Sequence, residues 1–380
     1  MPIPNPVFLL VPYRFSTGSD SGSIFSQLPI DGTGDFTYIR PGSASFIGSN
    51  GNIQFATSHN ARILNYYSGS GTCPAFLIEP SAQNITINSA VISGTPTGAS
   101  IDANVAVSPD GTTTADKLKE DSNPGNHNIA SVIGGSLGGT VDSSAYRISI
   151  FAKADGRTQF TLFDNAQSGA GAGVSTFNLS SGTATGTGVI QNYGNGWYRC
   201  IISCAKTDST NSNAFIRLLD AGGNSSYTGN GTSGILFWGK QLEVGSIATS
   251  YIPTTTAAVT RNADIATDTS YTFPLPNGTI YTEHFASRTS SYYAHSVGPV
   301  PITTGSNRIA VTYTPSKIAV YKNGSFLMSQ SMGTYEVGGS IINLGHSSGS
   351  YQLNDNLLAF AVYNSELTPA DAISLTSGSL

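Results

Sequence analysis

Turn dipeptides that adopt positive φ easily recur along the whole chain, and they constrain its fold more than any other feature. Asn-Gly pairs begin at residues 50, 195, 230, 277 and 323, and Asp-Gly pairs begin at residues 31, 110 and 155. These dipeptides favour type I′ turns, which join neighbouring antiparallel strands. Short strands linked by tight turns are therefore expected throughout.

The segments between these turns alternate in polarity with a period of two, and no long helical period is present. The alternating apolar positions are Tyr146, Ile148, Ile150 and Ala152 in one segment and Ile309, Val311 and Tyr313 in another. Such alternation is typical of strands with one buried face. The sequence therefore predicts an all-β fold of the antiparallel sandwich or barrel type.

Length and charge limit the number of domains and the kinds of partner. A chain of 380 residues suits two or three domains. Charged residues make up 10% of the chain and the net charge is −5, which argues against a nucleic-acid partner, because phosphates are neutralised by dense Lys and Arg. The longest purely apolar run, Leu357 to Val362, is far shorter than the ~20 residues of a membrane-spanning helix. The first residues, Met-Pro-Ile-Pro-Asn-Pro, lack the basic region of a signal peptide, so we expect neither secretion by that route nor a membrane partner.

Three cysteines are too few for a disulfide framework. Cys200 and Cys204 fall on one face of a predicted strand, roughly 13 Å apart. A disulfide needs Cα atoms within about 7 Å, so we expect two small buried residues and no bridge. Cys73 has no assigned role.

Three blocks of sequence carry a resemblance to a known family. They are Asn104-Val-Ala-Val-Ser-Pro-Asp-Gly-Thr-Thr-Thr-Ala-Asp-Lys-Leu118, Gly194-Asn-Gly-Trp-Tyr-Arg-Cys200, and the segment that runs from Trp238-Gly-Lys-Gln-Leu-Glu to Thr-Arg-Asn-Ala-Asp264. Together they resemble the carbohydrate-binding-module-like jelly roll of tailed-bacteriophage virion proteins, which occur in tail fibres, head fibres and related appendages. The resemblance implies a jelly-roll domain at residues 86–262.

Residues 1–85 resemble the short leader that often precedes this jelly roll. The resemblance is carried by residues 35–46, 50–56 and 75–80. The family usually shows an acidic residue after its Pro-Arg pair, and Asn60-Ala-Arg-Ile-Leu-Asn-Tyr-Tyr67 matches that pattern more loosely. By analogy, we expect residues 1–85 to be a virion-attachment region of irregular and β structure.

Residues 271–380 show a hairpin around Asn323-Gly324, a final strand ending near Tyr363, and a short helix. Thr368 can cap that helix, with Pro369 at its first position and Asp371 in its first turn. This order resembles the concanavalin A-like, laminin-G-type lectin sandwich. The fold expected for the whole chain is therefore two antiparallel β-sandwich (jelly-roll) domains in tandem after a small N-terminal region.

No catalytic residues are predicted. Gly-x-Ser-x-Gly occurs at residues 134–138 and 345–349, but neither site precedes the helix that a nucleophile elbow requires. Glycoside cleavage needs two carboxylates across the scissile bond, and the acidic residues are few and scattered. Glu243 sits in an apolar stretch beside Trp238, where we expect it to accept backbone donors or to pair with Arg199 or Arg261. We therefore expect a protein without enzymatic activity.

No metal or other cofactor is predicted. The five histidines are too far apart to form a local ligand motif. Lectin-type sandwiches often bind calcium through several carboxylates and carbonyls, but the C-terminal region lacks an Asp-rich loop. Asp355, between Asn354 and Asn356, is interpreted as a turn before the final strand.

Candidate carbohydrate-binding residues are Tyr292, Tyr293 and Tyr351, which are aromatic residues in polar loops of the C-terminal region. Aromatic rings of this kind pack against the apolar faces of sugars, while amide and carboxylate groups bond the hydroxyls. The alternative for each tyrosine is ordinary packing in a core or between subunits.

The resemblances imply a phage virion structural protein, a head or tail fibre whose lectin-like domains hold glycans on the host surface or in its surroundings. Each contact would be weak, and multivalency would strengthen attachment. On symmetry grounds we expect a homotrimer that is assembled in the bacterial cytoplasm, exposed on the virion, and bound to other virion proteins through residues 1–85. One alternative is a capsid decoration or tail structural protein without glycan binding, and another is a glycan depolymerase.

Overall fold

The structure is a computed structural model, and it is almost entirely β. It describes residues 3–11, 23–24, 28, 35–66, 74–136, 145–164, 173–205, 211–268, 276–286, 290–293, 299–331, 342–344 and 355–378. Within these ranges every sheet is antiparallel and the single α-helix is α1 (Pro369–Ser377). The all-β prediction is confirmed. In the described part of the chain, no helix has the length and apolar character needed to cross a membrane.

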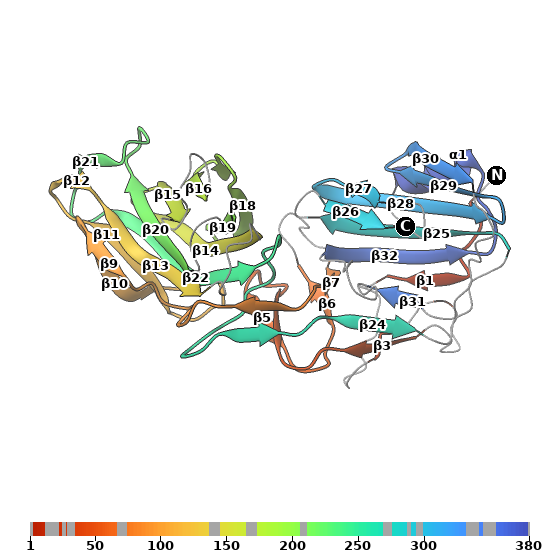
Figure 1. The fold of residues 1–380 in the computed structure, drawn as a ribbon, viewed down its shortest axis with the longest axis horizontal. Coiled ribbons are helices and arrows are strands. Elements are labelled where there is room, and N and C mark those ends of the chain that lie inside the picture. Colours follow the sequence, from red (N-terminus) through yellow and green to blue (C-terminus); the bar gives the residue numbers. More distant parts are fainter. Residues whose placement is uncertain are drawn as a thin grey trace. The chain divides into compact units, whose positions relative to one another are not determined.

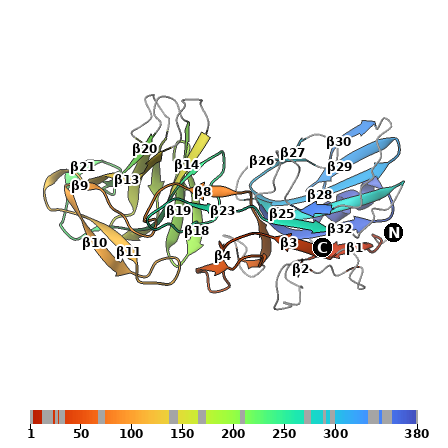
Figure 2. The same ribbon diagram turned by 60° about the horizontal axis from the view of Figure 1, so that its bottom comes forward.

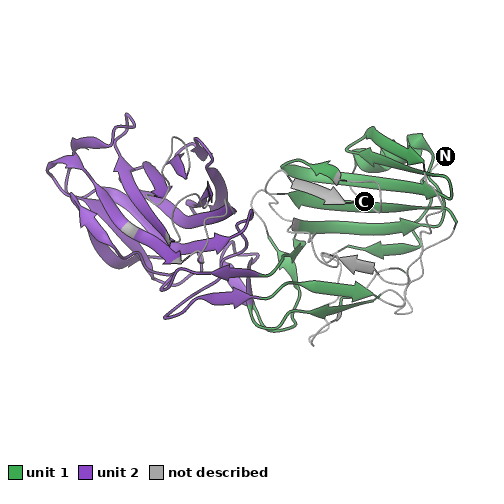
Figure 3. Ribbon diagram, in the orientation of Figure 1, with its two compact units in different colours: residues 1–43, 56–81, 262–380 green, residues 44–55, 82–261 purple. Residues whose placement is uncertain are grey.

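The chain forms two compact units, and one of them is assembled from distant parts of the sequence (Figure 3). Unit 1 contains residues 1–43, 56–81 and 262–380, and unit 2 contains residues 44–55 and 82–261. The expected borders at 85 and 262 lie close to the borders between units. Residues 1–85, however, are not a body of their own, because most of them belong to the same unit as the C-terminal region.

Unit 2 is built on two six-stranded sheets, ordered β10-β11-β22-β14-β19-β18 and β17-β16-β15-β20-β13-β9. When strands β11, β13, β14, β15, β16, β19, β20 and β22 are lettered B to I, the sheets contain the orders B-I-D-G and C-H-E-F, which is the strand order of a jelly roll. Figures 1 and 2 both show β10 beside β11. The strand bounds are β9 Thr95–Thr97, β10 Ala99–Ala106, β11 Ala115–Glu120, β13 Asn128–Ser136, β14 Ala145–Asp155, β15 Gln159–Asp164, β16 Val174–Asn178, β17 Thr183–Ala184, β18 Val189–Gly194, β19 Trp197–Ala205, β20 Asn211–Leu219 and β22 Gly234–Val244.

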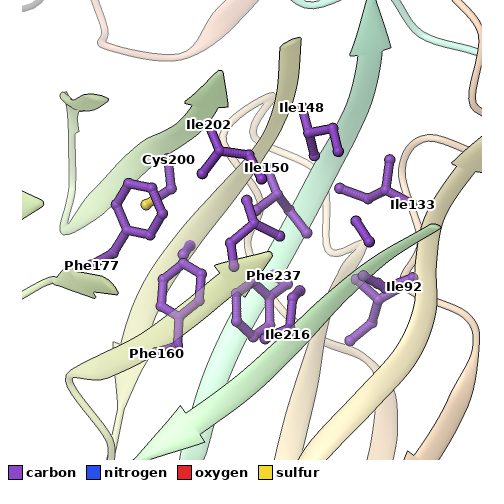
Figure 4. Close-up of a cluster of buried hydrophobic side chains, with 14 of the residues drawn as sticks. Ile92, Ile133, Ile148, Ile150, Phe160, Phe177, Cys200, Ile202, Ile216 and Phe237 are labelled. Carbon is purple, nitrogen blue, oxygen red and sulfur yellow. The ribbon is translucent and has the colours of Figure 1, made fainter. Parts of the chain in front are cut away.

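A single hydrophobic core lies between these two sheets (Figure 4). The alternation predicted in β14 is confirmed, since Ile148 and Ile150 are in this core while Phe151 packs in a separate cluster. Phe160 of β15 stacks on Phe177 with ring centroids 5.3 Å apart. Each fully buried aliphatic or aromatic side chain of this kind contributes about 1.5–3 kcal/mol to stability.

The three blocks that carry the family resemblance meet at a second cluster, which includes Phe151 of β14 and Tyr251. Trp197 donates its indole N–H to the carbonyl of Val107 (3.2 Å), and Trp238 donates to Thr114 Oγ1 (3.1 Å). A buried indole needs such an acceptor, so the expectation for Trp197 is confirmed. The blocks therefore pack together on the face of the β10-β18 sheet that points away from the core between the two sheets.

Short paired strands complete unit 2. Strand β8 pairs with β23 so that Ala82 lies opposite Arg261. The bounds are β4 Ala44–Ile47 and β5 Ile53–Ala56, β8 Ala82–Asn84 and β23 Val259–Arg261, and β12 Pro124–Asn126 and β21 Ser226–Thr228.

Unit 1 is built on an eight-stranded sheet in which strands from the two ends of the chain are neighbours. Its main path runs β30-β29-β28-β25-β32-β7-β6, and β1 also pairs with β32. Figure 2 shows the N-terminal strand β1 beside β32. The strand bounds are β1 Phe8–Leu10, β6 Arg62–Asn65, β7 Ala75–Ile78, β25 Gly278–Ala286, β28 Gly305–Thr314, β29 Lys317–Lys322, β30 Ser325–Ser331 and β32 Asp355–Tyr363.

Both faces of this sheet are covered. A four-stranded sheet, β2-β3-β24-β31, contributes Phe36, Tyr38 and Ala266 to the core on one face. Helix α1 contributes Ala372 and Leu375 to the core on the other face. A β-hairpin, β26 with β27, belongs to the same unit. The bounds are β2 Ser23–Ile24, β3 Phe36–Ile39, β24 Ile265–Asp268, β26 Ser290–Tyr293, β27 Pro299–Ile302 and β31 Ile342–Leu344.

A buried ionic network joins the N-terminal strands of unit 1 to the segment that precedes β24. Asp264 accepts hydrogen bonds from Arg40 Nη1 (3.1 Å), from Arg62 Nη2 and from the hydroxyl of Tyr38. Arg62 also bonds Glu79 (2.6 Å), whose backbone N–H donates to Asp264 (2.8 Å). Arg62 and Glu79 lie in the leader-like segments, and Asp264 ends the third resemblance block. These residues are structural links within unit 1.

Two of the predicted Asn-Gly turns take positive φ at both residues. They are Asn323-Gly324, between β29 and β30, and Asn195-Gly196, between β18 and β19. Asn277-Gly278 does not, so that prediction is wrong. Gly278 instead begins β25 opposite Tyr313, and a Cβ there would approach the Tyr313 hydroxyl to 2.1 Å. The glycine leaves room for the tyrosine ring.

The expected helix cap and the expected burial of Cys200 and Cys204 are confirmed. Thr368 caps α1 by accepting the N–H of Asp371 (3.2 Å), and Pro369 is the first helical residue. Cys200 and Cys204 are buried and free. Burial raises the pKa of the Cys204 thiol to about 12, which keeps it protonated. Cys73 lies outside the described residues.

Candidate functional site

The tyrosines predicted to bind carbohydrate fall where the structure describes little. Tyr292 and Tyr293 belong to β26, where their backbones pair with Val300 and Pro299 of β27. The positions of their side chains are not described, and Tyr351 lies outside the described residues altogether. The prediction for these three residues stays a prediction.

Glu243 has the structural role that was expected for it. The backbone N–H and the hydroxyl of Thr249 donate to its carboxylate at 3.1 Å and 2.6 Å. Arg199 lies 3.9 Å away from the same group. Burial raises the pKa of the Glu243 carboxyl, although Arg199 and the Thr249 donors oppose the shift. The side chain is enclosed and its oxygens are engaged within the protein.

The other positions tested for chemistry add no reactive group within the described ranges. Ser136 ends β13, and Ser347 lies outside those ranges. Asp355 is already the first residue of β32, with its backbone paired to Ile78, so the expected turn is replaced by strand at that residue. Asn356 accepts a hydrogen bond from Asn65 (2.6 Å). Among the described residues, no three His, Cys, Asp or Glu side chains come close enough to hold a metal.

A polar cluster surrounds Glu120 in unit 2, and its hydrogen-bond partners all come from the protein. Arg157 forms two hydrogen bonds with its carboxylate, at 2.6 Å and 2.7 Å. The Tyr227 hydroxyl (2.8 Å) and the Asn230 backbone N–H (2.9 Å) donate to the same oxygens. Burial would raise the pKa of Glu120, but these donors outweigh burial and lower it. The carboxylate is fully used inside the protein.

The outer face of the β17-β9 sheet is the open surface that combines aromatic and polar side chains. We call it the arginine face, and it is formed by Asn128, Thr161, Phe163, Thr176, Phe215 and Arg217. All six side chains are partly exposed. Because strand residues alternate between faces, the intervening residues Leu162 and Ile216 lie in the core of the jelly roll. The core thereby fixes which side chains point outward.

Two phenyl rings form the apolar part of this face. Phe163 of β15 lies directly opposite Phe215 of β20 in the ladder. Their rings stack with centroids 5.1 Å apart and planes inclined by 19°. Neither ring belongs to the core between the sheets. The pair presents a partly exposed aromatic platform on two central strands.

A row of polar side chains crosses the sheet beside this platform. The ladders place Thr176, Thr161, Arg217, Asn128 and Thr97 next to one another on five successive strands. The hydroxyl oxygens of Thr161 and Thr176 are 3.3 Å apart. Hydroxyl, amide and guanidinium groups therefore lie beside the two aromatic rings on the same face of the sheet.

Arg217 has no carboxylate partner among the described residues, in contrast to several other arginines of the chain. Its guanidinium carbon lies 5.2 Å from the centre of the Phe163 ring. Its Nε atom is buried and has no hydrogen-bond partner among the described residues. By contrast, Arg62, Arg157 and Arg308 each bond a carboxylate within 3 Å. Arg217 thus presents donors that the described protein does not use.

Such a face suits a ligand that has both apolar and hydroxyl-bearing surfaces. Aromatic rings offer a large apolar area, and a few placed polar groups fix the orientation of what lies on them. Among the described residues on the outer face of this six-stranded sheet, Arg217 is charged and the others are neutral. This described part of the face therefore holds no pair of carboxylates. The geometry offers a surface on which a small polar ring can lie.

These residues were missed from the sequence, although a signal was present. The alternation in residues 159–164 and 213–218 shows that Phe163, Phe215 and Arg217 share the polar side of their strands. It does not show that residues 163 and 215 are paired, because that depends on the order of strands in the sheet.

In comparisons with known proteins, no protein-family model and no curated protein matches the chain. The fold and the site define an all-β protein whose jelly-roll unit carries an open aromatic and polar face.

Proposed function

We propose that unit 2 binds carbohydrate without transforming it, and that the arginine face is its binding site. The observation that carries this proposal is the partly exposed stack of Phe163 and Phe215 beside a row of hydroxyl, amide and guanidinium groups. Sugar rings have apolar C–H faces that pack on aromatic rings and hydroxyls that bond such polar groups.

We further propose that the chain is a structural protein of a tailed-phage virion, a head or tail fibre that displays this face. The resemblance of residues 104–118, 194–200 and 238–264 supports the assignment. One flat face of a few side chains gives weak binding, and a homotrimeric fibre with several copies would multiply it. Neighbouring virion proteins are the expected partners at its attachment end.

The competing function is a capsid decoration or tail component that only packs against other virion proteins. Exposed apolar side chains favour it: Val105 and Val107 near the end of the edge strand β10 are 51% and 57% exposed, and Phe326 on the edge strand β30 is 54% exposed. A depolymerase has less support, since glycoside cleavage uses two carboxylates and the described arginine face has none.

The test is a glycan array with the purified full-length protein, followed by calorimetry on the glycans that bind. Phe163→Ala and Phe215→Ala are expected to weaken binding at least about tenfold, or ~1.4 kcal/mol, because each removes half of the aromatic platform. Phe326→Ala removes a more exposed ring from unit 1 and is the control, expected to bind as the unmodified protein does.

Three results would contradict the proposal. Unchanged glycan binding by both phenylalanine variants would place the site elsewhere. Release of reducing sugar from a bound glycan would make the protein an enzyme. Silence across the array, with the protein folded and in its native oligomer, would favour the decoration role.

A further inference from the structure

Arg217 is the single ionised side chain among the described residues of its face. Its neighbours across the ladders, Thr161 and Asn128, are neutral. The described residues that point outward from the other strands are also neutral: Thr95, Thr97, Ala130, Gly134, Gln159, Phe163, Val174, Thr176, Asn178, Thr183, Asn213 and Phe215. In a chain of net charge −5, this face therefore carries a local positive charge.

The nearest carboxylates along these strands are already engaged. Asp164 follows Phe163 and therefore points to the opposite side of the sheet, where it accepts hydrogen bonds from the Tyr146 and Ser212 hydroxyls at 2.5 Å and 2.8 Å. Asp220, just beyond β20, accepts from the backbone and side-chain N–H groups of Asn224 at 2.8 Å and 2.9 Å. Neither carboxylate forms an ion pair with Arg217.

The Phe163 ring orients the guanidinium. A guanidinium over an aromatic face gains a cation–π contact, and its planar donors remain available along its edge. The buried Nε has no acceptor within the described protein, so no carboxylate of the described residues competes for the guanidinium. The ligand group that matches a planar fork of donors is a carboxylate, because its two coplanar oxygens accept two parallel hydrogen bonds.

We propose that the arginine face selects saccharides that carry a carboxylate, with Arg217 binding that group while Phe163 and Phe215 contact the sugar ring. This inference rests on the proposed function and adds the chemical class of the ligand. A neutral glycan would leave the guanidinium donors to weaker hydroxyl acceptors, so acidic sugars should bind more tightly to the same rings.

The test uses the full-length protein and oligomers of galacturonic, glucuronic and mannuronic acid, each beside its methyl ester. Esterification removes the charge and keeps the sugar ring. At least one acid is expected to bind tenfold or more tightly than its ester, with a preference that shrinks as NaCl is raised. Arg217→Gln should abolish the preference for the acid over its ester, with a larger loss of affinity for the acid than for the ester. Arg217→Lys, which keeps the charge and loses the fork, should retain only part of it.

Arg147→Gln is the matched control, since Arg147 lies half-buried on the outer face of the other sheet of unit 2. It should keep the full preference for the acid. Thermal unfolding of each variant confirms that the fold is retained, which is expected because Arg217 forms no hydrogen bond or ion pair with another described residue.

Equal affinity for every acid and its ester, or a preference that survives Arg217→Gln, overturns the carboxylate inference. Both results leave the proposed function standing if Phe163→Ala still weakens binding. Binding of neutral glycans on the array without binding of any uronic acid oligomer overturns the inference in the same way. Binding that ignores both phenylalanines overturns the proposed function, and the inference falls with it.

Discussion

His284 is buried in the middle of β25, with only 1% of its surface exposed. Burial, and secondarily the charge of Lys322, lower the pKa of its imidazole to about 4. The same side chain in an unfolded chain has a pKa near 6.5. Below that pH the unfolded state therefore binds a proton that the folded state does not.

We predict that the free energy of unfolding decreases as the pH is lowered from about 6.5 toward 4. The sign follows because a folded pKa below the unfolded value makes the folded state relatively more stable at high pH. The loss should be about 1.4 kcal/mol per pH unit within this window. Denaturant unfolding at pH 7, 6 and 5 measures it, and His284→Asn should have a shallower slope than the unmodified protein. Equal slopes for the two proteins would contradict the prediction.

Sequence reasoning at this scale succeeded where the local surroundings decide a residue's role. Trp197 and Glu243 found the partners that their apolar neighbourhoods require. The site residues depend on something else. Phe163 and Phe215 meet because two strands separated by some fifty residues become neighbours in the sheet, and no local pattern encodes that pairing.

At the scale of elements, Asp264 links three strands and the segment before β24. Arg40 follows β3, Arg62 begins β6, and Glu79 follows β7. All four side chains are buried, so their charges depend on one another for compensation. Removing one partner of a buried ion pair typically costs about 3–5 kcal/mol, because the remaining charge stays desolvated.

Asp264→Asn is expected to destabilise unit 1 by about 3–5 kcal/mol, since Arg40 and Arg62 both lose their ion pair with the Asp264 carboxylate. Both tryptophans lie in unit 2, so their fluorescence reports that unit while circular dichroism reports the whole chain. The variant should show an earlier transition by circular dichroism than by fluorescence.

The surface pair of Lys119 and Asp102, 2.8 Å apart and partly exposed, provides the comparison. Asp102→Asn should change stability by less than about 1 kcal/mol, because solvent screens exposed pairs. Asp264→Asn and Asp102→Asn with equal effects would show that the buried network contributes no special stability.

Local turns and helix caps could be predicted from the sequence at this scale. The hairpin at Asn323-Gly324 and the cap at Thr368 follow from a few adjacent residues. Asn277-Gly278 shows where such a local prediction fails. Its glycine is required by Tyr313 on a neighbouring strand, which is a tertiary constraint that looks like a turn in the sequence.

At the scale of the whole molecule, unit 1 needs both ends of the chain. Strand β32 pairs with β1 and β7, and β24 pairs with β3. A sequence reading that follows the chain from one end to the other divides it into consecutive regions. That is why it does not anticipate the union of residues 1–43 and 56–81 with the C-terminal region.

A fragment of residues 262–380 is therefore predicted not to fold. It lacks the pairing partners β1, β3 and β7, and it leaves Asp264 without Arg40 and Arg62. A fragment of residues 82–261 contains both sheets of the jelly roll and should retain β structure. Circular dichroism and amide proton dispersion in NMR spectra distinguish the two outcomes. A cooperatively folded 262–380 fragment would contradict the division into these units.

The antiparallel pairing of β8 with β23 has an evolutionary consequence. The polypeptide leaves unit 1 twice, and the longer of these two segments begins and ends at neighbouring positions because Ala82 and Arg261 lie opposite each other. Recombination at these two points could exchange the intervening 180 residues, 261 − 82 + 1 by position, without interrupting any strand of unit 1, while residues 44–55 of unit 2 would stay in place. A lineage could thereby acquire a new recognition specificity in unit 2 and keep unit 1 unchanged.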